Sequence, residues 1–416
     1  MTARGTNGAS ATTCPASAKG SPEMTEPKPE TLNPTKLIQA GRPEGGDGLP
    51  VNPPVVRAST FSFRSMEAFN ATAATPFDAP FYGRVGTPTS FAFESAMAEL
   101  EGAHRAIAYP SGLAAIMAVY MAYLSAGDHV LMVDSVYGPA RRTMVRSLSR
   151  MGVSVDFYDP SIGAGIEALI GPETRLIYME SPGSGTFEVM DVPAIVTIAR
   201  KHGIVTAIDN TWATPHYFRP LEHGVDVSIH AATKYITGHS DAMLGVVAVS
   251  EAAHDALRRA TQDLGMVAGS EEVNLGLRGL HTLDVRLARH DANGRALATW
   301  LATRPETGRI LHPAHPDCTG HAIWKRDFAG ASGLFAVELP GWDEARINAF
   351  LRGMACFRIG FSWGGYESLA LPAHPESREH PKWKGGPVLR FHAGLEDPAD
   401  LIADLDRAFA RAAAEA

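Results

Sequence analysis

Apolar runs of strand length alternate with helical segments through the middle of the chain. The strand-like runs cover residues 106–109, 129–134, 153–158, 176–180, 205–209 and 225–229. Segments with helical character lie between them, at 113–124, 139–151 and 192–202. Strands that alternate with helices are typical of βαβ units, whose parallel strands form one sheet. The sequence therefore predicts an α/β fold with a parallel-rich central sheet flanked by helices.

The chain on either side of this region has a different pattern. The first ~80 residues are rich in Pro and Gly and weakly periodic, which favours an extended arm. After residue 281 the chain is more helical, with strand-like stretches at 333–339 and 388–392. We expect a disordered leader and extended N-terminal arm at 1–84, a large domain at 85–280 and a smaller C-terminal α+β domain at 281–416.

Composition narrows the classes of partner and compartment. The formal net charge of −8 provides no electrostatic attraction for nucleic acid or an anionic membrane surface. No apolar run is long enough to cross a membrane. Three cysteines, at 14, 318 and 356, cannot form a disulfide framework, which favours a reducing, cytoplasmic compartment. We interpret residues 1–21 as a leader without a secretory signal, and Met24 as an alternative start.

The strongest local signal is a lysine within the segment DVSIHAATKYITGHS, residues 226–240. Lys234 follows small residues at the end of a predicted strand, where burial would disfavour the ammonium and lower its pKa. A neutral amine at such a position can form a Schiff base with a carbonyl compound. An isolated lysine of this kind would be an ordinary surface residue, so this interpretation depends on the residues around it.

Two further segments lie where parallel strands present ligands. Asp209 ends the apolar run IVTAID, and a carboxylate there could pair with a protonated pyridine nitrogen. The segment YPSGL, residues 109–113, joins a strand to a helix whose first amides can bind phosphate, and Gly112 allows close approach. Either feature alone is equally an ordinary cap or turn. The chain has no GxGxxG or GxxxxGK(S/T) segment, so dinucleotide and P-loop sites lack support.

Arginines and aromatic residues supply the remaining candidates. Arg84, in the segment YGR that begins at Tyr82, could hold a phosphate through two parallel hydrogen bonds. Tyr137 lies in the loop after a predicted strand, where its ring could stack on a planar cofactor. Arg390 follows the segment FSWGGYES, residues 361–368, and could bind a substrate carboxylate in the same bidentate manner. Surface ion pairs or ordinary packing would explain each of them equally.

One further cluster has spacing that only loosely matches a metal site. It consists of His312, His315, Cys318 and His321. Pro and Gly residues between them indicate a loop without regular ligand geometry. We therefore predict no metal site.

Taken together, these segments resemble the Cys/Met-metabolism family of fold-type I enzymes that depend on pyridoxal 5'-phosphate (PLP). The segment around Lys234 matches the family's lysine signature throughout, and the resemblance extends from about Thr35 to the C-terminus. In more detail the chain is similar to bacterial cystathionine β-lyases. The segments that carry this likeness are SPGSGTFEV, DNTWATP, VSIHAATKY, GHSDAMLG, RGLHTL, WKRDF, FSWGGYES and GLEDPADLIADLD. Several long segments in the same order are more specific than any single motif.

The resemblance implies a role for each matching position of the cofactor site. Lys234 would form the Schiff base with PLP and then transfer protons. Asp209 would pair with the pyridine nitrogen, and Tyr137 would stack on the ring and assist proton transfer. The phosphate would be bound by the amides of Gly112 and Leu113 and by the hydroxyl of Thr233.

The resemblance also implies an active site shared between subunits. Tyr82 and Arg84 would reach the phosphate of a neighbouring subunit. The protein would then be at least a dimer and typically a homotetramer, built as a dimer of dimers. Arg390 would bind the α-carboxylate of a small sulfur amino-acid substrate, with Ser362 and Trp363 beside it.

Several positions depart from the family pattern or distinguish its branches. Ala231 stands where many relatives have Ser, which removes one hydroxyl from the phosphate site. Phe361 stands where bacterial β-lyases often have Tyr and cystathionine γ-lyases usually have Glu. Pro139 occupies a position where methionine γ-lyases have Cys, and residues 180–184 read ESPGS where γ-enzymes usually read ESPTN. The absence of the γ-enzyme residues at these three places favours β-elimination.

The resemblance thus implies a carbon–sulfur lyase that converts L-cystathionine to homocysteine, pyruvate and ammonia, a transsulfuration step in methionine biosynthesis. A broader cysteine-S-conjugate β-lyase or a cysteine desulfhydrase would need only a different pocket and stays open, as do a cystathionine γ-lyase and a γ-synthase. A non-catalytic PLP-binding regulator would have a degenerate pocket, yet every chemical position is present. An NAD-binding protein would share the fold class but not its glycine segment.

Overall fold

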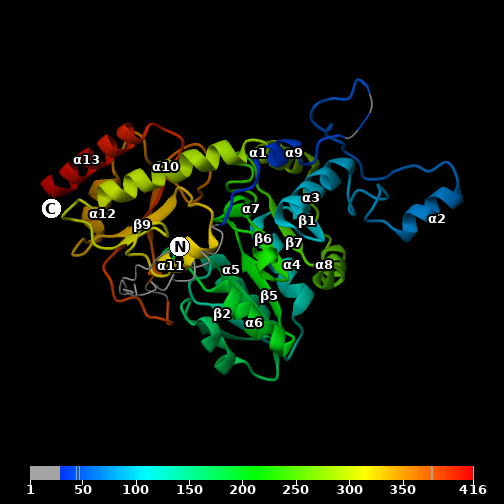
Figure 1. Cartoon of the computed structure of the whole chain (residues 1–416), viewed down its shortest axis with the longest axis horizontal. Coiled ribbons are helices and arrows are strands. Elements are labelled where there is room, and N and C mark those ends of the chain that lie inside the picture. The colour runs from blue at the N-terminus through cyan, green and yellow to red at the C-terminus, as the bar shows by residue number, and fades with distance from the viewer. Residues whose placement is uncertain (1–28, 44, 46, 376–377, 416) are drawn as a thin grey trace, which may run out of the picture.

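The computed structural model describes residues 29–43, 45, 47–375 and 378–415, so most of the expected leader, with Met24 and Cys14, lies outside the described residues. A seven-stranded sheet forms the centre of the molecule (Figure 1). Its strands are β1 (Arg105–Tyr109), β2 (His129–Val133), β3 (Ser154–Tyr158), β4 (Thr174–Glu180), β5 (Val205–Asp209), β6 (Val227–His230) and β7 (Gly245–Val249).

The topology of this sheet confirms the predicted parallel-rich α/β fold. The strand order is β1-β7-β6-β5-β4-β2-β3. Strands β6, β5, β4, β2 and β3 are parallel, whereas β7 is antiparallel to both of its neighbours. Each predicted strand-like run coincides with one of these strands. The central strands are almost continuously apolar because helices cover both faces of such a sheet.

Helices pack around the large sheet, and one of them differs from its prediction. They are α3 (Pro88–Glu101), α4 (Gly112–Tyr123), α5 (Gly138–Thr143), α6 (Val192–His202), α7 (Thr214–Tyr217), α8 (Glu251–Asp263) and α9 (Ser270–Leu280), with 3-10 turns at Gly163–Leu169 and Pro220–His223. The single helix expected at 139–151 is α-helical only to Thr143. A π-helical turn, Met144–Leu148, and a 3-10 turn, Ser149–Met151, follow it. The backbone N–H of Ser149 bonds Met144 O, one residue farther back than in an α-helix.

The C-terminal part of the chain forms a second, five-stranded sheet with its own helices at one end of the molecule (Figure 1). The sheet has the order β10-β11-β12-β9-β8. Its strands are β8 (Ile310–Leu311), β9 (Leu334–Glu338), β10 (Arg358–Ile359), β11 (Leu369–Ala373) and β12 (Val388–His392). The helices of this part are α10 (Leu283–Leu301), α11 (His321–Asp327), α12 (Glu344–Leu351) and α13 (Pro398–Ala414).

Helix α10 connects the two hydrophobic cores. Leu283 and Leu287, near its start, belong to the core that surrounds the large sheet. Leu297 and Leu301, near its end, belong to the core between the small sheet and α13. Because α10 passes from one core into the other, the domain boundary expected at residue 281 stays a prediction.

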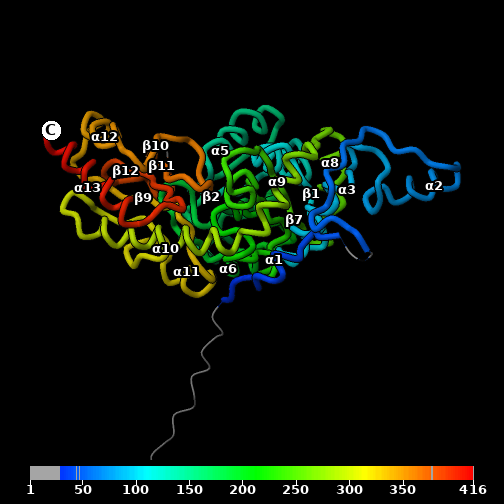
Figure 2. Tube along the Cα trace, turned by 90° about the horizontal axis from the view of Figure 1, so that it is seen from above, coloured from blue at the N-terminus to red at the C-terminus, as the bar shows by residue number. Residues whose placement is uncertain are grey.

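The N-terminal arm contains helices that its weak periodicity did not predict. They are α1 (Pro34–Gln39) and α2 (Met66–Ala74). The side chain of Ser65 caps α2 by accepting a hydrogen bond from Ala68 N at 3.2 Å, a local signal that does not depend on periodicity. Figures 1 and 2 both show α2 projecting from the body, at the end opposite α12 and α13. Within the described residues, no helix has the length and apolar character needed to cross a bilayer.

Candidate active site

The candidate site lies at the edge of the large sheet where its parallel strands end. Strands β2, β4, β5 and β6 run in the same direction, so their carboxyl ends share this edge. Asp209 is the last residue of β5, and Lys234 follows β6 by four residues. Tyr137 lies in the loop after β2, at the start of α5. The topology therefore brings together three residues that are far apart in the sequence, at the place where α/β sheets bind ligands.

Lys234 is a partly buried amine that contacts the FSWGGYES loop, residues 361–368. Its Nζ donates a hydrogen bond to Ser362 Oγ at 2.6 Å and lies 5.4 Å from the centre of the Trp363 ring. Burial lowers the pKa of Lys234 to about 8, and the nearby positive charge of Arg390 acts in the same direction. About a tenth of this lysine is therefore an uncharged nucleophile at pH 7, far more than for an exposed lysine.

The backbone around Lys234 is fixed from two sides. Gly364, in the FSWGGYES loop, has φ +88°, and a Cβ there would lie 2.8 Å from the carbonyl carbon of Lys234. Glycine is therefore needed for this loop to pack against the lysine. From the other side the buried guanidinium of Arg286 donates to Tyr235 O at 2.7 Å and to Gly279 O at 2.7 Å. The sequence analysis did not identify Arg286, because it lies in helix α10, 52 positions along the numbering from Lys234.

Asp209 is a buried carboxylate with one oxygen bonded and one free. Its Oδ1 accepts hydrogen bonds from Thr211 N at 3.0 Å and from Thr211 Oγ1 at 2.5 Å. Burial raises the pKa of Asp209, while the bonds from Thr211 and the charges of His230 and Lys234 oppose this increase. Oδ2 has no hydrogen-bond partner among the described residues. A free oxygen on a buried carboxylate is suited to pair with a protonated ring nitrogen.

Glu180 is a site residue to which the sequence analysis assigned no role. It ends β4, directly beside Asp209 in the register of β4 and β5. Its Oε2 accepts a hydrogen bond from the backbone N–H of Tyr137 at 2.6 Å, and its Oε1 accepts one from Ser184 Oγ at 2.6 Å. Burial raises the pKa of Glu180 well above its usual range, and the neighbouring charge of Asp209 raises it further. The available signal was an acidic residue that ends an apolar strand in the segment ESPGS.

The first turn of α4 and the residues before Lys234 form one wall of the site. A Cβ on Gly112 would lie 2.5 Å from the Cβ of Ala231, so glycine is required for this close packing. The side chain of Leu113 is 40% exposed, which leaves the helix start accessible. The hydroxyl of Thr233 donates to Leu244 O at 3.1 Å and accepts from Leu244 N at 2.9 Å. Binding a phosphate through Thr233 would therefore replace its bond to the Leu244 carbonyl.

Arg390 lies on β12, in the five-stranded sheet. One nitrogen, Nη2, donates to Phe361 O at 2.9 Å. Nη1 and Nε have no hydrogen-bond partner among the residues that the structure describes. Burial lowers the pKa of Arg390, and the group stays a cation at neutral pH. Two free donors of a guanidinium match the two oxygens of a carboxylate.

Tyr82 and Arg84 are not brought to Lys234 within one chain. Arg84 Nη1 donates to the backbone of Gln262 at 3.3 Å, and its guanidinium lies 5.6 Å from the ring centre of Tyr82. The Tyr82 side chain is 43% exposed, and Arg84 is exposed as well. The structure therefore places both residues on the outside of the chain, beside α8.

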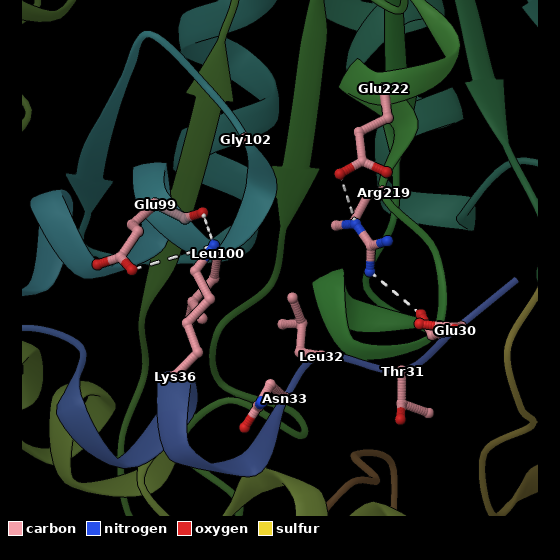
Figure 3. A pocket seen from close by; sticks show the side chains of 10 residues that line it. All are labelled: Glu30, Thr31, Leu32, Asn33, Lys36, Glu99, Leu100, Gly102, Arg219 and Glu222. Atoms are coloured by element: carbon pink, nitrogen blue, oxygen red, sulfur yellow. Dashed lines mark hydrogen bonds and ion pairs between the residues drawn. The ribbon is translucent and has the colours of Figure 1, made fainter.

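Two other features are separate from the candidate site. A cavity of about 300 Å³ lies where the N-terminal segment meets α3, and none of the predicted site residues line it (Figure 3). Its charged groups contact one another or the backbone: Lys36 Nζ donates to Glu99 O at 3.0 Å, and Arg219 Nε donates to Glu222 Oε1 at 2.8 Å. Within the described ranges, no three His, Cys, Asp or Glu residues are grouped to hold a metal ion.

The residues of the candidate site fit PLP on chemical grounds. An amine of lowered pKa, a free carboxylate oxygen and an accessible helix N-terminus match the aldehyde, ring nitrogen and phosphate of that cofactor. The required contact between Gly112 and Ala231 holds the helix start next to the segment that bears Lys234. The site therefore contains groups of the kind needed at each polar end of the cofactor.

Comparisons with known proteins agree with this chemistry. The family model of Cys/Met metabolism PLP-dependent enzymes matches residues 34–410. The chain is 47% identical over 369 residues to a putative cystathionine beta-lyase of Rhizobium johnstonii, covering 88% of this chain and 92% of the relative. It is 42% identical to a cystathionine beta-lyase of Escherichia coli, covering 91% of this chain and 98% of the relative.

A solved structure extends the likeness to three dimensions. The cystathionine gamma synthase of Xanthomonas oryzae, determined in complex with aminoacrylate and cysteine, superposes with a TM-score of 0.83 at 29% identity. The match covers 92% of this chain and 99% of that one. The family suggested by the sequence segments is therefore confirmed, and so is the cofactor that it uses. The chain belongs to the Cys/Met metabolism family of PLP-dependent enzymes.

Proposed function

We propose that this protein is a carbon–sulfur lyase that catalyses β-elimination of L-cystathionine. One water is consumed: the Cα–H and Cβ–S bonds break, homocysteine leaves as the thiol, and the remaining three-carbon fragment yields pyruvate and ammonia. The observation that carries this proposal is the partly buried amine of Lys234, with a pKa of about 8, beside the buried carboxylate of Asp209. A basic amine and a fixed anion at one sheet edge suit the removal of a proton next to an amino group.

The cofactor site would be assembled from the residues of the large domain. When bound, PLP supplies an electron sink for the negative charge that develops at the substrate α-carbon. Lys234 would hold it covalently, the free Oδ2 of Asp209 would face its ring nitrogen, and Tyr137 would lie against its ring. The phosphate would be bound at the start of α4, by the amides of Gly112 and Leu113.

Lys234 would also move the proton. Once its Nζ is free, it would accept the α-proton of the substrate and return a proton to the departing sulfur. A base is most effective when its pKa lies near the working pH, and the pKa of Lys234, about 8, meets this condition. The hydrogen bond from Nζ to Ser362 Oγ, at 2.6 Å, would keep the amine oriented toward the substrate side of the site.

Arg390 would orient the substrate through its α-carboxylate. Its Nη2 is engaged by Phe361 O at 2.9 Å, which holds the guanidinium in place, while its other donors stay free for the ligand. Trp363 would form the adjacent apolar wall and exclude water from the reacting carbons. Orientation of this kind makes a large contribution to rate, because the reacting atoms must approach in a narrow geometry.

The active site would be completed by a second subunit. Tyr82 and Arg84 are exposed beside α8, and they do not contact the Lys234 side of their own chain. A neighbouring chain could present them to its partner's phosphate, which would make the unit a dimer and, by pairing of dimers, a homotetramer. The mass of the PLP-loaded protein by light scattering would test this assembly, and a monomer with full activity would contradict it.

Preference for β-elimination over γ-elimination rests on the absence of γ-enzyme residues. Phe361 offers no carboxylate to a distal amino group, and Pro139 offers no thiol. The names of the R. johnstonii and E. coli relatives point to the same reaction. A broader activity on other cysteine S-conjugates would use the same groups, so relative kcat/KM values for cystathionine, cystine and S-methylcysteine would rank these substrates.

The decisive experiment identifies both products formed from L-cystathionine by the purified, PLP-loaded protein. Pyruvate together with homocysteine is the expected result. 2-Oxobutyrate together with cysteine would instead establish γ-elimination and overturn the proposal. Absence of both pairs, with turnover of another S-conjugate, would retain the lyase chemistry but replace the substrate.

A further inference from the structure

We propose that Glu180 is a positioning residue that stays protonated in the resting protein, so that it anchors the Tyr137 backbone while Asp209 remains the single anion at this edge of the sheet. The catalytic consequences of this proposal rest on the proposed function. The protonation itself is a property of the chain alone and can be measured without a substrate.

Two carboxyl groups lie side by side at this edge of the sheet. Glu180 and Asp209 are register partners at the ends of the parallel strands β4 and β5, so their side chains leave the same face of the sheet. Glu180 is 7% exposed and Asp209 is 8% exposed. Two carboxylates this close cannot both ionise at little cost away from water, and one of them keeps a proton.

Positively charged neighbours act on Asp209 but not on Glu180. Lys234 and His230 act on Asp209 and favour its ionised form, and both bonds from Thr211 do the same. Glu180 has no ion pair with a lysine, arginine or histidine in the described part of the chain. A buried carboxyl without a cation is expected to be neutral. The proton therefore belongs on Glu180.

The remaining titratable groups that face Glu180 do not alter this assignment. They are the phenols of Tyr120, Tyr137 and Tyr178, and burial raises the pKa of each of them. All three are uncharged at neutral pH, so none can supply the positive charge that an ionised Glu180 would need.

The hydrogen bonds of Glu180 are compatible with the protonated form. Its Oε2 accepts from Tyr137 N at 2.6 Å, which a neutral carboxyl oxygen can do as well as a charged one. Its Oε1 lies 2.6 Å from Ser184 Oγ, and a hydroxyl can either donate to a carboxylate or accept from a carboxylic acid. Both bonds therefore remain when the proton is present.

These bonds explain why Glu180 would position Tyr137. Tyr137 is the residue that begins α5, and no side chain caps this helix. Glu180 binds the backbone of Tyr137 directly, and Ser184 N donates to Ser135 O in the same loop at 2.7 Å. The loop that carries Tyr137 is thus tied at two points to the end of β4. Loss of the Glu180 side chain would release one of these points.

The variant Glu180→Gln tests whether Glu180 is neutral or charged in the wild type. Gln has the shape of a protonated glutamic acid and can accept from Tyr137 N and donate to Ser184 Oγ. The control is Glu188→Gln, because Glu188 is equally buried in the same connection but is paired with the Arg378 guanidinium. The two variants therefore remove a buried carboxyl group that we expect to be neutral and one that we expect to be charged.

The direct readout is the infrared carbonyl stretch of a protonated carboxylic acid, which ionised carboxylates lack. The spectrum is recorded on the cofactor-free protein at about pH 8, above the pKa of about 7 to which burial raises the buried carboxyl of Glu94. The wild-type minus Glu180→Gln difference should contain this band, and the wild-type minus Glu188→Gln difference should not. A Glu180 difference without the band would overturn the proposal, whatever reaction the enzyme catalyses.

The kinetic readout tests the positioning role with the PLP-loaded protein. Glu180→Gln should keep kcat and KM within about threefold of wild type, because both hydrogen bonds remain. Glu180→Ala should lower kcat by about 10- to 100-fold through displacement of Tyr137. Equal losses in the two variants would contradict a role through hydrogen bonding alone. Because the infrared band needs no substrate, failure of the β-lyase proposal would leave it unchanged.

Discussion

Two buried glutamates at and after the end of β4, Glu180 and Glu188, differ in whether a cation balances their carboxyl group. At the end of β4, Glu180 lies beside Asp209, and the nearest cations serve only the aspartate. Eight residues later, Glu188 forms an ion pair with Arg378, and Thr186 donates to it at 2.6 Å. In the second cluster, around Glu188, the acid is matched by a cation, although Arg378 Nε and Nη2 have no hydrogen-bond partner among the described residues. The first cluster, around Glu180, contains two acids, and within the described residues Oδ2 of Asp209 has no hydrogen-bond partner.

This difference separates residues that stabilise the fold from residues that await a ligand. A buried ion pair such as Glu188–Arg378 balances its own charge, and breaking it leaves an uncompensated charge. An unmatched pair of acids costs stability in the free protein, but it provides the negative charge that a protonated ring nitrogen requires. Arg378 and Glu188 should therefore govern stability, whereas Asp209 and Lys234 should govern cofactor binding and turnover.

Removal of the Lys234 amine should have the largest effect on kcat and on PLP binding. Lys234→Ala should lower kcat by at least about 10³-fold and abolish covalent attachment of PLP, because no other nucleophile lies at this position. Steady-state kinetics and the visible absorbance of the purified protein measure both effects. Retention of both the yellow colour and full activity would refute the assignment of Lys234.

Removal of the anion should have the next largest effect. Asp209→Asn keeps the shape of the side chain and can still accept bonds from Thr211, but it cannot hold a proton on the ring nitrogen. We expect kcat to fall by about 10²- to 10³-fold, with weaker PLP binding, since electrostatic stabilisation is lost. Dialysis against buffer followed by titration with PLP measures the affinity. An unchanged affinity and rate would show that Asp209 does not face the cofactor.

Arg390 should affect the substrate but not the cofactor. Arg390→Ala should lower kcat/KM by about 10²-fold, mainly through a higher KM, because a charged bidentate contact to the α-carboxylate is lost. The PLP absorbance should stay as in the wild type. Arg390→Lys should restore only part of the loss, since a lysine cannot form two parallel bonds. Full recovery with lysine would indicate a simple charge requirement.

Removal of the Arg378 partner of Glu188 should lower the stability of the fold and leave kcat almost unchanged. Arg378→Ala leaves Glu188 buried without its partner, and we expect a loss of about 3 kcal/mol in the free energy of unfolding. At a temperature where the variant is folded, kcat should stay within about twofold of wild type. Chemical denaturation and kinetics on the same sample give both numbers. A large loss of kcat with unchanged stability would reverse the proposed difference between the clusters.

The rate at which the cofactor-free protein captures PLP should depend on pH through Lys234. Its pKa, about 8, is below the usual lysine value of 10.5, so the neutral amine becomes dominant as the pH rises through 8. The rate of PLP capture should increase across that point and then level off. Because the unfolded chain binds the additional proton between these two pKa values, this group also makes stability rise with pH in that window. A capture rate that rises only near pH 10.5 would indicate an exposed lysine.

The large sheet could be predicted from the sequence for a clear physical reason, because long apolar runs specify buried parallel strands. The site residues proposed from the sequence lie near the ends of these runs: Asp209 ends β5, and Lys234 follows β6 by four residues. The helix around residues 139–151 was only partly right, because its change to a π-helical turn has no signature in the apolar pattern. The roles of Glu180 and Arg286 depend on strand register and on contacts between distant segments, which a pattern within one window does not contain.

We propose that PLP binds through Lys234 at the edge of the large sheet where Asp209 ends β5. This attachment is tested most directly by reducing the PLP-loaded protein with borohydride, digesting it and locating the pyridoxyl group by mass spectrometry. The account predicts one modified peptide, with the group on Lys234 in the segment VSIHAATKY. A pyridoxyl group on a different lysine, or spread over several, would contradict it.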